Sequence, residues 1–155
     1  MNIRIEIRKA VSEDYAQVKK AIFNLLGQLR NSKVDSLEGF EQAYFKIIEN
    51  DSNGCILIAR EKDRICGLLS LSKAYALHCG GLYGILEELW VDKKYQNNGV
   101  GSKLIDFICD YCKENNIRRI DVGLPDSQYK YYSYTYNFYK KKGFTEIGTR
   151  MKLSI

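Results

Sequence analysis

Residues 86–101 read LEELWVDKKYQNNGVG: a hydrophobic run, a polar turn and then two closely spaced glycines. The hydrophobic run is typical of a strand, and the residues after Gly99 return to the apolar spacing of a helix. A glycine lets the backbone approach an anion closely, and the first-turn N–H groups of a helix lie at its positive end. The stretch therefore predicts a phosphate-binding loop between a strand and a helix.

Two common phosphate-binding motifs fit this loop poorly. A dinucleotide-binding fingerprint needs a third glycine, and Leu104 occupies that position. A P-loop needs a Gly-Lys-Ser/Thr triplet, whereas residues 101–103 read Gly-Ser-Lys. A nucleotide-binding domain, which would bind ATP or a dinucleotide here, is therefore disfavoured.

The same stretch resembles the signature segment of the GCN5-related N-acetyltransferase (GNAT) family, in which [QR]-x-x-G-x-[GA] is the loop for the pyrophosphate of acetyl-CoA. Residues 137–144, NFYKKKGF, resemble the F-Y-x-x-x-G-F element that this family has near its C-terminus. The two motifs occur in the family's order and at the family's distance. By this resemblance the chain is identified as a member of the GNAT family.

The resemblance implies a set of residues that bind acetyl-CoA. In the loop and the start of the helix these are Gln96, Asn97, Asn98, Gly99, Val100, Gly101 and Ser102, and in the preceding strand Leu89, Trp90 and Val91. The strand residues would pair their backbone groups with the pantetheine arm. The family often has an asparagine where this chain has Tyr132, so Asn137 is expected to replace that contact. No metal is implied.

The resemblance also implies two catalytic residues. An amine with a pKa near 10.4 is almost fully protonated at pH 7, so a base must remove a proton before it can attack. Glu87 matches the position of the family's general base, with Glu88 as the alternative beside it. Tyr139 matches the tyrosine that protonates the departing CoA thiolate, since its ordinary pKa near 10 keeps it protonated.

Hydrophobic periodicity predicts the elements around these motifs. The expected strands are Ile3–Arg8, Cys55–Arg60, Ile65–Ala74, Leu82–Val91 and Ile117–Val122, with a last extended region at Phe144–Ser154. The first expected helix begins at the cap residue Ser12. Three further helices are expected at Ser36–Ile48, Gly99–Asn115 and about Thr135–Lys142. We expect a mixed α/β (α+β) fold in which a twisted, mostly antiparallel sheet is flanked by helices and splays where acetyl-CoA enters.

Length and composition bound the class of protein. The 155 residues suit one domain over residues 1–155, and no apolar run approaches the roughly 20 residues that cross a bilayer. The N-terminus reads as a strand and not as a signal peptide, which predicts a cytoplasmic protein. The five scattered cysteines are expected to be free thiols. The net charge of +5 is too dispersed to indicate nucleic-acid binding.

The sequence thus predicts an acetyl-CoA-dependent N-acetyltransferase that transfers the acetyl group directly to a primary amine in a ternary complex. The alternative is a catalytically inactive CoA-binding sensor or interaction module with the same fold. The acceptor is expected to be a small-molecule or peptide amine, whose identity the motifs leave open. A homodimer is possible because dimers are frequent in the family, and the tyrosine-rich residues 129–136 are candidates for the acceptor pocket or a subunit interface.

Overall fold

The structure is a computed structural model that describes residues 4–155. Its strands are β1 (Glu6–Lys9), β2 (Gly54–Glu61), β3 (Arg64–Ala76), β4 (Gly81–Val91) and β5 (Ile120–Val122). Its α-helices are α1 (Tyr15–Arg30), α2 (Phe40–Glu49), α3 (Val100–Glu114) and α4 (Tyr132–Lys141). Short 3₁₀ turns cover Ser12–Asp14, Leu77–Cys79 and Lys93–Tyr95.

The five strands form one sheet in the order β1-β2-β3-β4-β5. Neighbours are antiparallel except β4 and β5, which are parallel and joined through α3. A parallel pair requires such a crossover, whereas β2, β3 and β4 follow one another through short turns. The expected fold class, a mixed and mostly antiparallel sheet flanked by helices, is confirmed.

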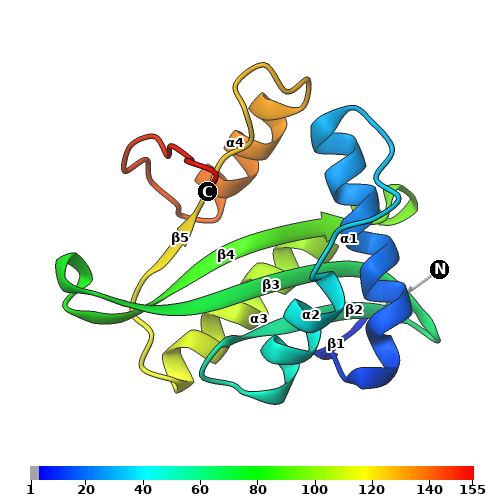
Figure 1. The fold of residues 1–155 in the computed structure, drawn as a ribbon, viewed down its shortest axis with the longest axis horizontal. Coiled ribbons are helices and arrows are strands. Elements are labelled where there is room, and N and C mark those ends of the chain that lie inside the picture. The colour runs from blue at the N-terminus through cyan, green and yellow to red at the C-terminus, as the bar shows by residue number, and fades with distance from the viewer. Residues whose placement is uncertain (1–3) are drawn as a thin grey trace. The chain divides into compact units, whose positions relative to one another are not determined.

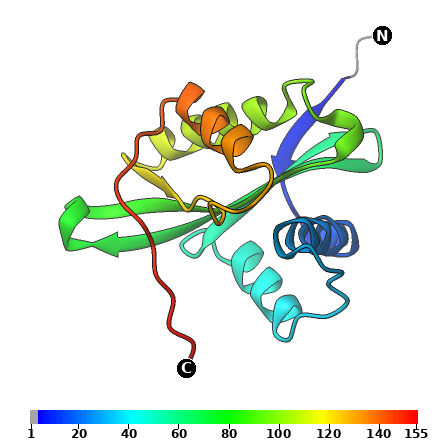
Figure 2. The same cartoon turned by 90° about the horizontal axis from the view of Figure 1, so that it is seen from above.

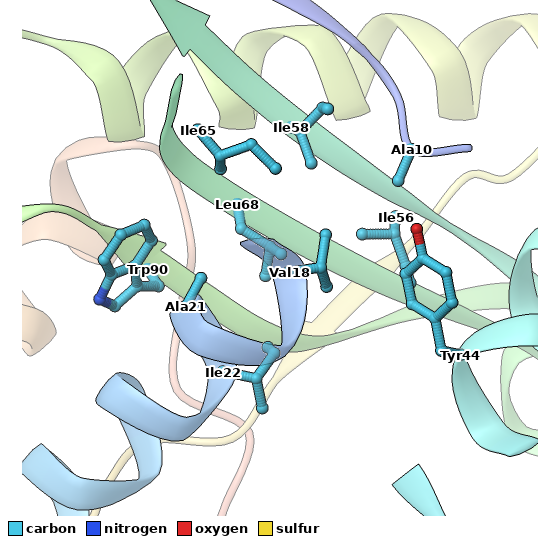
Figure 3. Packing of buried hydrophobic residues seen from close by; sticks show 10 residues of the cluster. All are labelled: Ala10, Val18, Ala21, Ile22, Tyr44, Ile56, Ile58, Ile65, Leu68 and Trp90. Atoms are coloured by element: carbon cyan, nitrogen blue, oxygen red, sulfur yellow. The ribbon is translucent and has the colours of Figure 1, made fainter. Parts of the chain in front are cut away.

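Helices cover both faces of this sheet. Figures 1 and 2 show α1 and α2 on one face and α3 on the opposite face. Buried residues on the α1–α2 side form the cluster drawn in Figure 3, namely Ala10, Val18, Ala21, Ile22, Tyr44, Ile56, Ile58, Ile65, Leu68 and Trp90. The fully buried side chains Leu104, Ile105 and Ile108 come from α3. The sheet is therefore buried on both faces, as its continuous apolar strands predict.

The start of α1 differs from the expected cap. Ser12 begins a 3₁₀ turn, and the α-helix begins only at Tyr15. The buried Asp14 accepts a hydrogen bond of 2.8 Å from the Val11 N–H and pairs with both terminal nitrogens of Arg8, at 2.7 and 3.0 Å. Asp14 satisfies the backbone at this entry and ties it to β1, because its carboxylate can accept several bonds where a serine hydroxyl accepts fewer. The expected strand start, Ile3, lies outside the described residues.

Other boundaries also differ from the prediction. α2 begins at Phe40 and not at Ser36, after Gly39 with its left-handed φ of 78°. β5 begins at Ile120 and not at Ile117, because the Ile117 N–H bonds the Cys112 carbonyl at 2.8 Å and closes the end of α3. The tyrosine-rich segment was expected to precede the last helix, but α4 begins at Tyr132, and Tyr132 and Tyr136 stack one turn apart. No strand forms within Phe144–Ser154, where an extended region was expected.

Internal contacts divide the chain into two units, one ending at Val122 and one comprising Gly123–Ile155. A single domain over residues 1–155 stays a prediction. The five cysteines are free thiols. Among the described residues, no helix has the length and apolar composition needed to cross a membrane.

Candidate acetyl-transfer site

A β-bulge in β4 separates the two acidic residues that the sequence singled out. Glu88 is paired with Ser70 and Leu86 with the next residue, Leu71, so Glu87 is an extra residue in β4. An extra residue is left outside the regular alternation of a strand pair. Glu87 is exposed, whereas Glu88 is largely enclosed and lines a cavity between the sheet, α1 and α2.

Ser70 holds the Glu88 side chain and backbone together. The Ser70 hydroxyl donates to the Glu88 carboxylate and accepts from the Glu88 N–H at 3.2 Å. Burial raises the pKa of the Glu88 carboxyl above its ordinary value, the Ser70 hydrogen bond opposes this, and the nearby Glu87 charge adds to the rise. A carboxylate with a raised pKa is a stronger base, which suits proton abstraction.

The cavity beside Glu88 has a volume of about 340 Å³ and a mostly apolar wall. Its apolar lining residues are Val18, Ile22, Leu26, Leu37, Phe40, Ala43, Tyr44, Ile47, Ile56 and Leu68. The others are Arg30, Glu38, Gly39, Ser70 and Glu88. Figure 3 shows Val18, Ile22 and Leu68 of this wall converging from α1 and β3. Such a cavity, apolar with a few polar groups, is the usual form of a small-molecule site.

The pairing of β4 with β5 stops where the bulge begins. It consists of Gly84 with Ile120, Ile85 with Asp121, and Leu86 with Val122. Beyond Leu86, no strand in the described part of the chain pairs with β4 on its β5 side. This end of β4 carries Leu89, Trp90 and Val91, the three strand residues expected to pair with pantetheine. Trp90 is buried and belongs to the cluster in Figure 3, whereas Leu89 and Val91 are half-buried.

Side chains from the neighbouring strands anchor the turn that follows β4. The Asp92 carboxylate accepts the Lys94 N–H at 2.9 Å and pairs with Arg64 at 2.7 Å. The buried Tyr95 donates its hydroxyl to the Glu61 carboxylate. These bonds hold the turn to the hairpin of β2 and β3, so the glycine loop starts from a defined position.

The loop itself uses left-handed backbone at two positions. Asn97 has φ of 62° and Gly99 has φ of 78°, values that asparagine and glycine tolerate best. Gln96 donates its side-chain amide to the Val91 carbonyl at 3.2 Å, and Asn98 donates to the Gln96 carbonyl at 3.1 Å. These amides brace the loop from within. Space around Gly99 is open, since a Cβ built there would meet nothing within 4 Å.

The first turn of α3 follows Gly99 and comes close to the sheet. Val100 is almost fully buried, and a Cβ added to Gly67 of β3 would lie 2.8 Å from its Cγ1 atom. Only glycine at position 67 allows this approach. The helix start, with Gly101 and Ser102 in its first turn, thus directly follows the braced loop, and its first N–H groups lie at the positive end of α3.

The remaining predicted residues belong to the unit Gly123–Ile155. Tyr139 lies in α4, where its ring packs edge-on against Phe138 and Phe144 at centroid distances of 5.4 and 5.3 Å. Burial raises the pKa of Tyr139 to about 12, so its hydroxyl stays protonated at neutral pH. Gly143 ends this helix with φ of 94°, as its sequence position predicts. Asn137 is exposed on α4.

The unit that ends at Val122 therefore contains Glu88, the free end of β4 and the glycine loop along one continuous segment. Ser70 and the apolar cavity wall were missed by sequence reasoning. A signal for Ser70 was present, since a lone serine interrupts the apolar run Ile65–Leu71 of β3. The cavity wall gave no comparable signal, because core residues and pocket residues have the same composition.

Comparison with known proteins agrees with this geometry. Residues 20–144 match the Acetyltransferase (GNAT) family. A glucosamine 6-phosphate N-acetyltransferase of Arabidopsis thaliana is 26% identical over 99 residues, which cover 61% of this chain and 66% of that protein. The chain thus spans just under two thirds of that curated relative.

Solved structures show the same fold. The structure of the same-named Arabidopsis thaliana enzyme has a TM-score of 0.74 at 22% identity, covering 97% of this chain and 98% of that one. A transcriptional regulator from Bacillus halodurans C-125 has a TM-score of 0.80 at 21% identity, covering 98% and 100%. A metagenomic aminoglycoside acetyltransferase reaches 0.78 at 18% identity, covering 97% and 96%. On the extent of the family match and its signature loop, the chain belongs to the acetyltransferase (GNAT) family.

Proposed function

We propose that this protein is an acetyl-CoA-dependent N-acetyltransferase that transfers the acetyl group directly to an amine in a ternary complex. The observation that carries the proposal is the enclosed Glu88 carboxylate, which borders a cavity on the strand that leads into the glycine loop. A proton acceptor and an anion-binding loop on one segment are the two features that acyl transfer from a CoA thioester to an amine requires.

The residues present fit acetyl-CoA. The open space at Gly99 leaves room for a pyrophosphate against the loop, and the backbone of Leu89, Trp90 and Val91 is free of a strand partner on the β5 side. In this proposal the loop N–H groups bind the pyrophosphate, and this end of β4 pairs with the pantetheine arm. Bound acetyl-CoA supplies the thioester acetyl group.

Glu88 is proposed as the general base, with Glu87 as the alternative that the family resemblance favours. In the overall transfer a C–N bond forms and the C–S bond breaks. The amine loses one proton, which Glu88 accepts, and the thiolate gains one on leaving. Glu88 is favoured because its carboxylate borders the cavity and has a raised pKa, whereas Glu87 is exposed at the bulge.

Tyr139 is proposed to give the thiolate its proton. A hydroxyl whose pKa is about 12 holds its proton at neutral pH and passes it readily only to a strong base that forms beside it. Asn137 is proposed as a further cofactor contact from the same helix.

The proposal is tested by calorimetric titration with acetyl-CoA, followed by release of free CoA thiol over a panel of amines. The panel includes glucosamine 6-phosphate, because that substrate is in the name of the Arabidopsis relative. We expect saturable binding and amine-dependent thiol release. Well-folded protein that binds no acetyl-CoA would overturn the proposal.

A matched pair of variants separates the enzyme from an inactive CoA-binding module and identifies the base. Glu88→Gln and Glu87→Gln make the same isosteric change at neighbouring positions. We expect Glu88→Gln to lower kcat by about a hundredfold and to leave acetyl-CoA binding intact, while Glu87→Gln keeps most of the activity. The reverse result would make Glu87 the base. Tight binding without turnover of any amine would favour the sensor.

A further inference from the structure

We infer that the acceptor is a hydrophobic monoamine: one amino group on an aliphatic or aromatic body that carries no second charge. This inference deepens the proposed function and rests on it for the reaction. It is carried by the composition of the cavity beside Glu88: Glu88 and Ser70 form a polar corner on the sheet side, Arg30 and Glu38 are exposed lining residues, and the rest of the wall is mostly apolar.

The polar corner suits a single amine. Glu88 and Ser70 are paired across β3 and β4, so their polar groups lie together on the sheet side of the cavity. A carboxylate and a hydroxyl can together accept hydrogen bonds from one ammonium or amine group. The Tyr44 hydroxyl, which also lines the wall, already donates a hydrogen bond to the Val11 carbonyl at 2.6 Å.

The wall suits an apolar body. Val18, Ile22, Ile56 and Leu68 are each at most 7% exposed and surround the sheet side of the cavity. Leu26 and Phe40 continue this wall along α1 and α2. Burial of an apolar acceptor in this wall removes it from water and contributes about 0.8 kcal/mol of favourable binding free energy per CH₂ group. A sugar hydroxyl in the same place would lose hydrogen bonds to water without replacement.

The charged residues of the wall lie toward solvent. Arg30 ends α1 and Glu38 precedes α2, and both side chains belong to exposed residues. Among the described lining residues, Glu88 is thus the one charged group on the sheet side. On the sheet side a phosphate would therefore face the Glu88 carboxylate, and a second ammonium would find no further carboxylate. Arg30 and Glu38 could pair with such groups only at exposed positions, where ion pairs contribute little, so sugar phosphates and polyamines are expected to be poorer ligands.

The volume limits the size of the acceptor. At about 340 Å³ the cavity lies near the lower end of the range for small-molecule sites, roughly 300 to 1,000 Å³. A phenylalkylamine or a medium-chain alkylamine fits such a space, whereas an aminoglycoside of several rings exceeds it.

The test compares amines that differ in one property. 2-Phenylethylamine and phenylalanine differ by a carboxylate, and hexylamine and 1,6-diaminohexane differ by a second charge. We expect kcat/KM for the first member of each pair to exceed that of the second, and that of glucosamine 6-phosphate, by at least about tenfold. A polar or doubly charged amine that reacts faster than both hydrophobic monoamines would overturn the inference and leave the proposed function intact.

Two Ala→Phe substitutions test whether the acceptor amine binds in the cavity. Both alanines are exposed helix residues, but Ala43 on α2 is among the residues that line the cavity and Ala16 on α1 is not. We expect Ala43→Phe to raise KM for 2-phenylethylamine by about tenfold and Ala16→Phe to leave it unchanged. Equal KM values in both variants would overturn the inference.

Direct binding of 2-phenylethylamine to the protein, followed by calorimetry, distinguishes the two proposals. Binding that Ala43→Phe weakens, without turnover of any amine, would support the cavity inference and contradict the proposed function. The absence of both binding and turnover with the hydrophobic monoamines would overturn the inference.

Discussion

Among single residues, Glu88 has the environment that its neighbours in the sequence predict least. It follows another glutamate, yet the two have opposite environments, because the bulge leaves Glu87 exposed and Glu88 beside the cavity. Position in the family motif favours Glu87, and the local physics favours Glu88. Burial acts on Glu88 and raises its pKa.

The pH dependence of the reaction follows from this environment. If Glu88 must be ionised to accept a proton, kcat/KM rises with pH through the Glu88 pKa, which lies above its ordinary value of 4.5. Glu87→Gln removes a neighbouring charge that raises this pKa, so the acidic limb should move to lower pH. Ser70→Ala removes the hydrogen bond that lowers it, so the limb should move to higher pH. Initial rates between pH 4.5 and 8 measure both shifts, and shifts of the same sign would contradict the assignment.

A second prediction at the scale of a single residue concerns the hydroxyl of Tyr139. Tyr139→Phe removes the hydroxyl but keeps the ring that packs against Phe138 and Phe144, so thermal stability should hardly change. We expect kcat to fall by about a hundredfold with little change in KM, because protonation of the thiolate affects the chemical step. Tyr136→Phe in the same helix is the matched control. Full activity of Tyr139→Phe would leave Tyr139 with a packing role alone.

At the scale of elements, the join between β4 and α3 places the parts of the proposed acetyl-CoA site one after another along the chain. The bulge ends the pairing with β5, the anchored turn at Asp92 follows, and the left-handed Gly99 starts the helix. Gly67 lets the start of α3 approach the sheet. Each of these features is local, yet together they expose one free strand edge next to one helix N-terminus.

Gly99 and Gly80 provide a matched test of this join. Both have left-handed backbone, with φ of 78° and 70°, and a Cβ at either would meet nothing within 4 Å. Alanine should therefore cost about 1 kcal/mol of stability at both positions, from backbone strain alone. Only Gly99→Ala should weaken acetyl-CoA binding, by about tenfold, because only Gly99 lies in the loop.

Calorimetric titration of both alanine variants measures this difference, with thermal unfolding as the check on stability. Equal affinities for acetyl-CoA in the two variants would mean that the pyrophosphate does not lie against Gly99.

On the scale of the molecule, the Arg8–Asp14 pair links the first strand to the first helix. Burial acts to raise the Asp14 pKa, but the hydrogen bonds from Arg8 and from the Val11 N–H outweigh it and lower the pKa below 3.8. A carboxyl with a lowered pKa stabilises the fold above its unfolded-state pKa and loses that contribution as the pH falls. The pair should therefore contribute at neutral pH and fade below about pH 4.

Urea unfolding of Asp14→Asn tests this linkage. At pH 7 the variant should be about 2 kcal/mol less stable than the parent, a usual value for hydrogen bonds to a charged group. The difference should shrink at pH 3. Asp51→Asn breaks the exposed pair with Lys9, also on β1, and should cost less than about 1 kcal/mol. A difference for Asp14→Asn that stays constant with pH would contradict a charge effect.

The fold class, the glycine loop and the family could be predicted from the sequence, because short-range patterns encode them. Gln96, Gly99 and Gly101 form a contiguous motif, and apolar periodicity is a property of each element alone. The boundaries of the elements were predicted less accurately. Tyr132, Tyr134 and Tyr136 alternate like an extended segment, but stacking of Tyr132 on Tyr136 across one turn accompanies a helix.

Which acidic residue borders the cavity, and which residues surround it, depends on how distant parts of the chain pack together. The bulge at Glu87 arises from the register of β3 against β4, and register depends on pairing between strands and not on either strand alone. The cavity wall is assembled from α1, α2 and three strands whose residues are far apart in the chain. An apolar side chain in such a wall has the same sequence pattern as one in a filled core, so only packing in three dimensions separates them.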